Sequence, residues 1–201
     1  MFIAVSSEGA LLEAPLSVLH TGRGSTAIGE HTQATGGSTT LDRAELFKAL
    51  GFPAQLNIDC THNSNIHRAV LQKVFINCVI NPLTAMFNCR NGELLSNARY
   101  HASFVALCAE LQAVYNALER ESNSAAAAAG EPAPKAFELA QRAAKVARAT
   151  AANQSSMLSD WLAGRRLELD SLNCHIGEAA RELGIACPLN TGIIEQLQPK
   201  R

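Results

Sequence analysis

The chain has 201 residues and a formal net charge of −1; 47% of its residues are hydrophobic and 17% are charged. This composition is typical of a globular protein with a buried core, and the nearly neutral charge argues against an extended basic surface for nucleic acid or an anionic membrane. No run reaches the roughly 18 uninterrupted apolar residues of a membrane span, and the first residues lack the basic start and long apolar run of a secretory signal. We therefore expect a cytoplasmic protein whose partners include neither nucleic acid nor membrane.

The first sixty residues carry short apolar runs separated by turn residues. They predict strands over 2–5, 17–20 and 27–29, then a helix over 42–50 and a strand over 52–59. Gly22 to Ala27 also fits the spacing G-x-G-x-x-[G/A] of a dinucleotide fingerprint, with Asp42 about twenty residues later. Because Ser25 to Gly29 is β-prone and does not open a helix, we favour a hairpin turn at Gly22 to Gly24.

From residue 65 onward, apolar residues recur at the helical spacing of 3.6. Helices are expected over 65–80, 82–89, 97–121, 135–151, 155–163, 169–184 and 190–197. The segment 122–134 is rich in alanine and then in glycine and proline, which predicts an exposed connection with a helical start.

The cysteines and histidines do not form a metal-binding pattern. No C-x-x-C pair occurs, and His62 and His67 are five residues apart, which misses the i, i+4 spacing of a helical metal pair. Scattered thiols are typical of small core residues in a reducing compartment. We expect no metal site.

A polar stripe crosses the apolar segment that begins near residue 70. Lys73, Asn77 and Asn81 follow one another at intervals of four, so they share one helix face over about 12 Å. In one interpretation Lys73 reaches water, the amides bond across helices, and Asn81 caps a new helix that starts at Pro82. In the other, the ammonium donates a proton while the amides hold a hydroxyl or carboxylate.

Three further positions have both a structural and a functional interpretation. Asn91, followed by a glycine, is a turn residue of left-handed geometry or a ligand amide. Ser155 and Ser156, preceded by Asn153, cap a helix or bind a ligand carboxylate at its start. Glu168 taken alone is a surface carboxylate that pairs with Arg165 or Arg166.

Two long segments, KVFINCVINPLTAMFNCRNGELL from Lys73 and TAANQSSMLSDWLAGRRLELDSLN from Thr150, carry a specific resemblance. Together, and in this order, they resemble the substrate domain of the ketopantoate reductase family, and the similarity runs from about Ser6 to Gln196. Leu71 and Gln72 depart from the family, which usually has a basic residue just before the lysine. The resemblance implies an NADPH-dependent reductase of a small 2-keto acid, in pantothenate biosynthesis, with a surface for a homodimer.

The resemblance also assigns roles to residues. It implies that Lys73 is the catalytic proton donor and that Glu168 faces the substrate hydroxyl or the cofactor. The amides and hydroxyls around the substrate would be those of Asn77, Asn81, Asn91, Asn153, Ser155 and Ser156.

The glycine-rich turn, the basic residue for the 2′-phosphate and the Gln-Asn-Gly segment of such reductases are not found in the sequence. We therefore expect a mainly α protein in two parts. Residues 1–60 would be the remnant of a truncated α/β nucleotide-binding domain, a β-hairpin, helix and strand, and residues 61–201 an all-helical substrate-binding and dimerisation domain. Three functions remain open: a ketopantoate reductase or a fragment of one, a reductase of another 2-keto acid, and a non-catalytic helical binding or oligomerisation module.

Overall fold

The structure is a computed structural model that describes residues 2–22, 24–30, 60–62, 65–128 and 136–198. The chain divides into two compact units, Met1–Leu71 and Gln72–Arg201, and the division falls inside one long helix. The helix predicted over 42–50 and the strand predicted over 52–59 lie outside the described residues.

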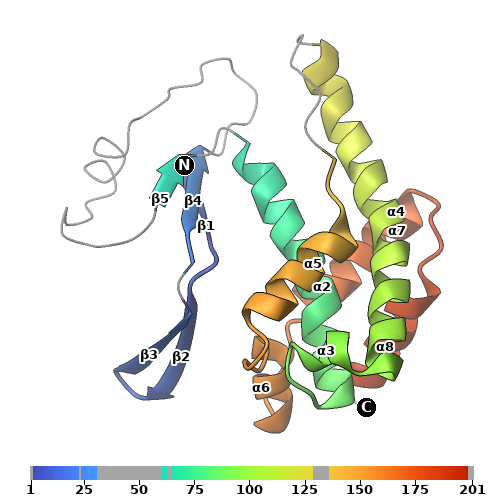
Figure 1. Ribbon diagram of the computed structural model, residues 1–201. Coiled ribbons are helices and arrows are strands. Elements are labelled where there is room, and N and C mark those ends of the chain that lie inside the picture. Colours follow the sequence, from blue (N-terminus) through green and yellow to red (C-terminus); the bar gives the residue numbers. More distant parts are fainter. Residues whose placement is uncertain (1, 23, 31–59, 63–64, 129–135, 199–201) are drawn as a thin grey trace. The chain divides into compact units, whose positions relative to one another are not determined.

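The first unit contains short strands (Figure 1). A three-stranded sheet has the order β1-β4-β5, in which β1 is antiparallel and β5 parallel to β4. A separate antiparallel pair is formed by β2 and β3. The strands predicted over 2–5, 17–20 and 27–29 are confirmed, whereas β2 was not predicted. The bounds are β1 Phe2–Ser6, β2 Gly9–Ala14, β3 Ser17–Gly22, β4 Thr26–Glu30 and β5 Cys60–His62.

Gly22 ends β3 and Gly24 lies two residues before β4, so the glycine pair does not open a helix and is not a dinucleotide-binding turn. It is not a hairpin turn either, because the strands on its two sides belong to different sheets. The requirement for glycine at 24 comes from close packing: a Cβ there would lie 2.4 Å from the carbonyl carbon of Ser7. The Ser7 hydroxyl accepts the N–H of Ser25 at 2.8 Å, which holds the two backbones together.

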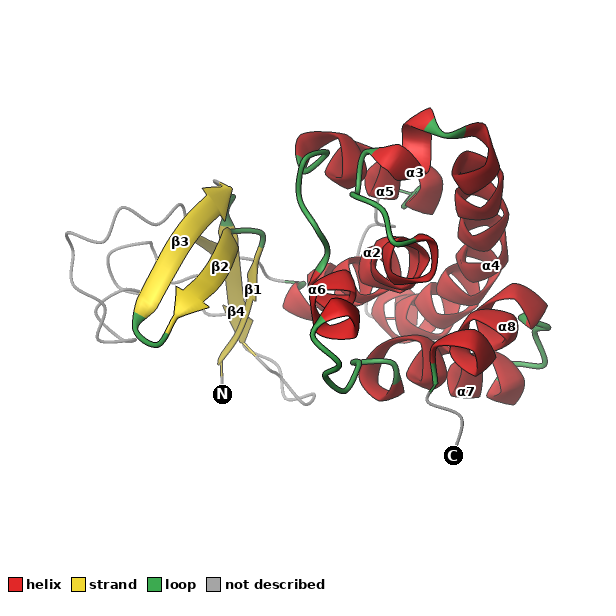
Figure 2. Ribbon diagram, turned by 90° about the horizontal axis from the view of Figure 1, so that it is seen from below, coloured by secondary structure: helices red, strands yellow, loops and turns green. Residues whose placement is uncertain are grey.

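The second unit is helical, which confirms the predicted mainly α fold class with a small β element at its N-terminal side. Viewed in Figure 2, α2 lies in the middle of the helical unit, and the other helices surround it. α4 runs through Ala128, which confirms the helical start predicted for the segment 122–134, and residues 129–135 lie outside the described residues. The bounds are α2 Ile66–Phe87, α3 Glu93–Ser96, α4 Ala98–Ala128, α5 Leu139–Ala149, α6 Ser156–Leu162, η1 Asp170–Cys174, α7 His175–Glu182 and α8 Pro188–Leu197.

The core of this unit forms where α2 meets α4. The Phe75 ring packs edge-on against Tyr115 with centroids 5.2 Å apart, and Phe137 covers Tyr115 from the other side at 4.4 Å. Both Phe75 and Tyr115 are fully buried, and burying a large side chain of this kind contributes about 1.5–3 kcal/mol. Gln72 donates to the Tyr115 hydroxyl at 3.3 Å, so the residue that departs from the family pattern is used in the packing of α2 on α4.

By length and hydropathy alone, α2 could cross a membrane, and it is the single helix of the described residues that passes this test. Half of its most apolar window is buried inside the protein. The core helix of a globular protein meets the same criteria, and the packing around Phe75 accounts for the apolar composition of α2.

α2 continues through Pro82, so the predicted break at residue 81 is wrong, and Asn81 does not cap a new helix. A proline inside a helix removes the N–H that would bond to the carbonyl four residues earlier, here that of Cys78. The side-chain amide of Asn173 donates to this carbonyl oxygen at 3.0 Å. A distant residue therefore replaces the missing donor, and the helix persists to Phe87, where Asn88 adopts a positive φ of 47° and ends it.

Candidate functional site

The polar stripe on α2 passes from solvent into the protein. Lys73 is exposed, Asn77 is half-buried and Asn81 is only 8% exposed. Among the apolar residues beside the stripe, Phe75, Cys78 and Val79 are fully buried. The stripe therefore places the charged amine at the surface and the second amide at the bottom of the same helix face.

Asn81 meets the start of α6. Its Nδ2 lies 3.5 Å from the Ser156 hydroxyl, a long hydrogen bond between residues that are 75 positions apart. Ser156 is exposed, whereas the neighbouring Ser155 is buried. The structure thus brings together one predicted amide and one predicted hydroxyl from different helices.

Ser155 is the N-cap of α6, and its hydroxyl accepts the N–H of Leu158 at 3.0 Å. It also lies 2.7 Å from the hydroxyl of Thr84, a fully buried residue of α2. Thr84 donates to the carbonyl oxygens of Ile80 and Asn81, both at 2.9 Å, so the hydrogen between the two hydroxyls comes from Ser155. These bonds fasten the start of α6 to the part of α2 around the proline.

Asn91 joins the loop after α2 to the loop before α6. Its backbone N–H bonds to the carbonyl of Asn153 at 3.1 Å, and its Nδ2 bonds to the Thr150 hydroxyl at 2.9 Å. Its Oδ1 is buried and has no hydrogen-bond partner among the described residues. The alternative of a left-handed turn at this position is wrong: Gly92 has a φ of −67°, and it is small because a Cβ would lie 2.6 Å from that of Ala151.

Glu168 is exposed in the segment between α6 and η1. The two nearby arginines pair with other carboxylates, Arg165 with Asp160 at 2.7 Å and Arg166 with Asp170 at 2.5 Å. The pairing of Glu168 with one of these arginines that its sequence position suggested is therefore not observed.

In the described part of the chain, two pairs of predicted residues are in contact, and a further predicted residue bonds to one that was not predicted. Asn81 contacts Ser156, and Asn91 contacts Asn153, while Ser155 is tied to Thr84. Lys73, Asn77 and Glu168 are not members of these contacts. Thr84, Thr150 and Asn173 were not predicted, although all three lie inside the two segments that carry the family resemblance. The sequence could not predict them, because a buried polar side chain is identified by its hydrogen-bond partners in the fold and not by its spacing along the chain.

The buried thiols of Cys78 on α2 and Cys108 on α4 are poor nucleophiles. Burial raises the pKa of Cys78 to about 12, and it raises that of Cys108 likewise to about 12. A thiolate is the nucleophilic form of cysteine, so neither thiol is suited to catalysis near neutral pH. No cluster of metal-ligating side chains occurs within the described ranges.

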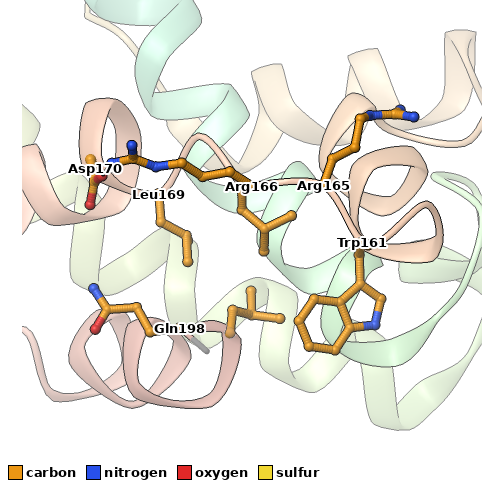
Figure 3. A pocket seen from close by; sticks show the side chains of 9 residues that line it. Trp161, Arg165, Arg166, Leu169, Asp170 and Gln198 are labelled. Atoms are coloured by element: carbon orange, nitrogen blue, oxygen red, sulfur yellow. Dashed lines mark hydrogen bonds and ion pairs between the residues drawn. The ribbon is translucent and has the colours of Figure 1, made fainter. Parts of the chain in front are cut away.

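An open pocket of about 960 Å³ lies between the end of α6 and the end of α8 (Figure 3). Trp161 and Leu169 point toward the edge of the pocket at which Gln198 lies. Arg165 points away from the pocket, and Arg166 pairs with Asp170. Of the predicted site residues that the structure describes, none lines this pocket. Leu167 and Leu169 line it and Glu168 does not, so it is a neighbouring feature and not the candidate site itself.

The chain is similar to known proteins over most of its length. The chain is 35% identical over 184 residues to the 2-dehydropantoate 2-reductase of Shigella flexneri, covering 91% of this chain and 53% of that protein. A PanE/ApbA family ketopantoate reductase from Ralstonia eutropha JMP134 superposes with a TM-score of 0.71 at 24% identity, over 97% of this chain and 57% of that one. A D-mandelate dehydrogenase, solved with NADH and anilino(oxo)acetate, gives 0.72 at 19% identity over 96% and 57%.

The class of protein that these relatives define is an oxidoreductase with a helical C-terminal domain. Residues 65–201 match the model of the ketopantoate reductase PanE/ApbA C-terminal domain. The chain belongs to this family, and it spans about half the length of the reductases that it matches.

Proposed function

We propose that this chain supplies the substrate-binding part of an NADPH-dependent 2-dehydropantoate 2-reductase of the cytoplasm. The observation that carries the proposal is the contact of Asn81 with Ser156, which joins the Lys-Asn-Asn stripe to the second family segment. The proposed substrate is supported by relatives that match nine-tenths of this chain and are named 2-dehydropantoate 2-reductase.

The proposed roles follow from the chemistry of each group. The exposed ammonium of Lys73 stabilises the charge that grows on the C2 oxygen of the keto acid and donates the proton to it. Asn77 and Asn81 are neutral, so they bind the substrate hydroxyl or carboxylate without neutralising the lysine. Ser156 offers its hydroxyl from the opposite helix, and Ser155 positions it. Asn91 and Asn153 hold the two loops together on the same side of α6.

NADPH supplies the hydride in the proposed reaction. The described residues do not fit a nucleotide-binding turn, since Gly24 precedes a strand and not a helix, and it is packed against Ser7. The proposal for this chain is therefore limited to the acid end of the reaction. Glu168 stands on an exposed segment and is proposed to contact the cofactor or the substrate hydroxyl.

The proposal is tested by titrating the chain with 2-dehydropantoate and following Trp161, the single tryptophan of the sequence, by fluorescence together with calorimetry. We expect saturable binding, and Lys73→Met should weaken it about tenfold or more because the ammonium that contacts the C2 oxygen of the keto acid is lost. Lys145→Met is the matched control, since Lys145 is an exposed lysine on α5. Where the chain turns over with NADPH, Lys73→Met should lower the rate by about 10²–10⁴-fold.

The absence of binding at millimolar 2-dehydropantoate would contradict the proposal. Equal affinities of the Lys73→Met and Lys145→Met variants would remove Lys73 from the site. Because the same fold is found in a D-mandelate dehydrogenase, pyruvate and phenylglyoxylate belong in the titration, and tighter binding of either would assign the chain to another 2-keto acid.

A further inference from the structure

Asn173 occupies an unusual place between two helices of the second unit. It is fully buried, and its Nδ2 donates both to the Cys78 carbonyl at 3.0 Å and to Asn190 Oδ1 at 2.8 Å. The Cys78 carbonyl is the one that Pro82 leaves without its helical donor. Both hydrogens of the Asn173 amide are therefore in use, one of them to complete the hydrogen bonding of α2.

Asn190 holds this amide in place. Its own Nδ2 donates to the backbone carbonyl of Asn173 at 2.9 Å, so the two asparagines bond to each other twice. Glu110 of α4 fixes Asn190 by accepting the backbone N–H of Leu189 and of Asn190, at 2.9 and 2.7 Å. The orientation of the Asn173 amide is thus determined by α8 and α4 and not only by its own segment.

The hydrogen bond from Asn173 to the Cys78 carbonyl, called the tether below, connects α2 with the segment that carries Glu168. Cys78 lies between Asn77 and Asn81 on α2, and Asn173 lies five residues after Glu168. Asn173 belongs to η1, a π-helical turn in which the Cys174 N–H bonds to the Leu169 carbonyl at 2.9 Å. Single π-helical turns are uncommon and occur frequently at functional sites.

We propose that Asn173 is a positioning residue: by replacing the N–H that Pro82 lacks, it fixes the segment that carries Glu168 against the amide face of α2. This role rests on the proposed function of that face. Pro82 and Asn173 then act together. The proline exposes a carbonyl in the middle of a buried helix, and the asparagine uses this carbonyl as an anchor for the segment 168–174.

This proposal predicts that Pro82 and Asn173 are energetically coupled. Asn173→Leu keeps the size of the side chain but leaves the Cys78 carbonyl without a donor, and it should lower the folding equilibrium constant of the chain about tenfold or more. Pro82→Ala restores the helical N–H, so the same Asn173→Leu change should cost several-fold less in that background. Unfolding is followed in urea by far-UV circular dichroism, and Asn173→Ser repeats the cycle in a milder form if Asn173→Leu does not fold.

Ile193→Val on α8 is the control, because its cost should be equal in both backgrounds. If Asn173→Leu also costs the same in the unaltered chain and in the Pro82→Ala variant, the amide does not replace the proline's donor and the proposal is overturned.

A second measurement separates positioning from stability. Asn173→Leu should weaken the binding of 2-dehydropantoate about tenfold, and the double variant with Pro82→Ala should regain stability without regaining affinity, since the tether is still absent. Ile193→Val should lose stability and keep its affinity.

Unchanged affinity of Asn173→Leu would show that Asn173 is structural and would overturn the positioning role. A complete lack of binding by the unaltered chain would instead refute the proposed function, and the positioning role with it. The stability cycle needs no ligand, so these two failures are distinguishable.

Discussion

At the scale of single residues, adjacent serines at the start of α6 divide two tasks. The Ser155 hydroxyl is saturated, because it accepts from Leu158 and donates to Thr84. The Ser156 hydroxyl is exposed and has one long contact with Asn81. The first therefore holds the helix and the second remains accessible to a ligand.

This division predicts opposite effects of the same substitution. Ser155→Ala should destabilise the chain by about 1–2 kcal/mol, through the lost cap and the lost hydrogen bond to the buried hydroxyl of Thr84. It should change the affinity for 2-dehydropantoate little. Ser156→Ala should change stability by less than about 0.5 kcal/mol and weaken 2-dehydropantoate binding. Urea unfolding and fluorescence titration of both variants check this, and indistinguishable profiles would contradict it.

At the scale of elements, the N-terminus of α8 is capped by a side chain of α4. Pro188 occupies its first turn, where a missing N–H is not harmful. The next two N–H groups are accepted by the two carboxylate oxygens of Glu110. α8 is thereby capped from outside its own sequence, and the cap also orients Asn190.

Removing this external cap should loosen the contact between α4 and α8. We expect Glu110→Ala to cost about 1–2 kcal/mol in the free energy of unfolding, and Glu110→Gln, which keeps one acceptor oxygen, roughly half of that. Glu195→Ala on the exposed face of α8 is the comparison and should stay within about 0.5 kcal/mol. A loss of equal size at Glu195 would show that charge, and not capping, is responsible.

At the scale of the whole molecule, the small β element carries open strand edges. Among the described strands, β1 is paired on one side only, and β2 and β3 form a sheet of two. Leu16 at the tip of this pair is fully exposed, and Val18 is largely so. Unpaired edges and exposed apolar side chains recruit other chains.

The chain is therefore expected to associate in solution. Ala4→Lys places a charge on the exposed side of β1 and should lower the average mass measured by light scattering after gel filtration, because lysine on an edge strand opposes pairing. Ala113→Lys, at an exposed position of α4, should have no such effect. A clean monomer of the unaltered chain would refute the prediction.

The sequence by itself determined the mainly α class, most of the helices and the polar stripe on α2, because helical periodicity and the four-residue spacing of Lys73, Asn77 and Asn81 are local properties. It also identified the two family segments. It missed β2, whose alanine and glutamate residues are poor strand formers, and α3, whose four residues leave little periodic signal. It also did not recognise 122–128 as part of the helix predicted over 97–121.

Only the tertiary structure decided that α2 continues through Pro82. Local rules end a helix at a proline, since the carbonyl of Cys78 loses its donor, and the donor that restores it lies 95 residues away on Asn173. The same is true of Ser155, Thr84 and Asn91, whose partners come from other segments. Buried polar groups are satisfied by whatever the fold brings within hydrogen-bonding distance, and no spacing along the chain records that distance.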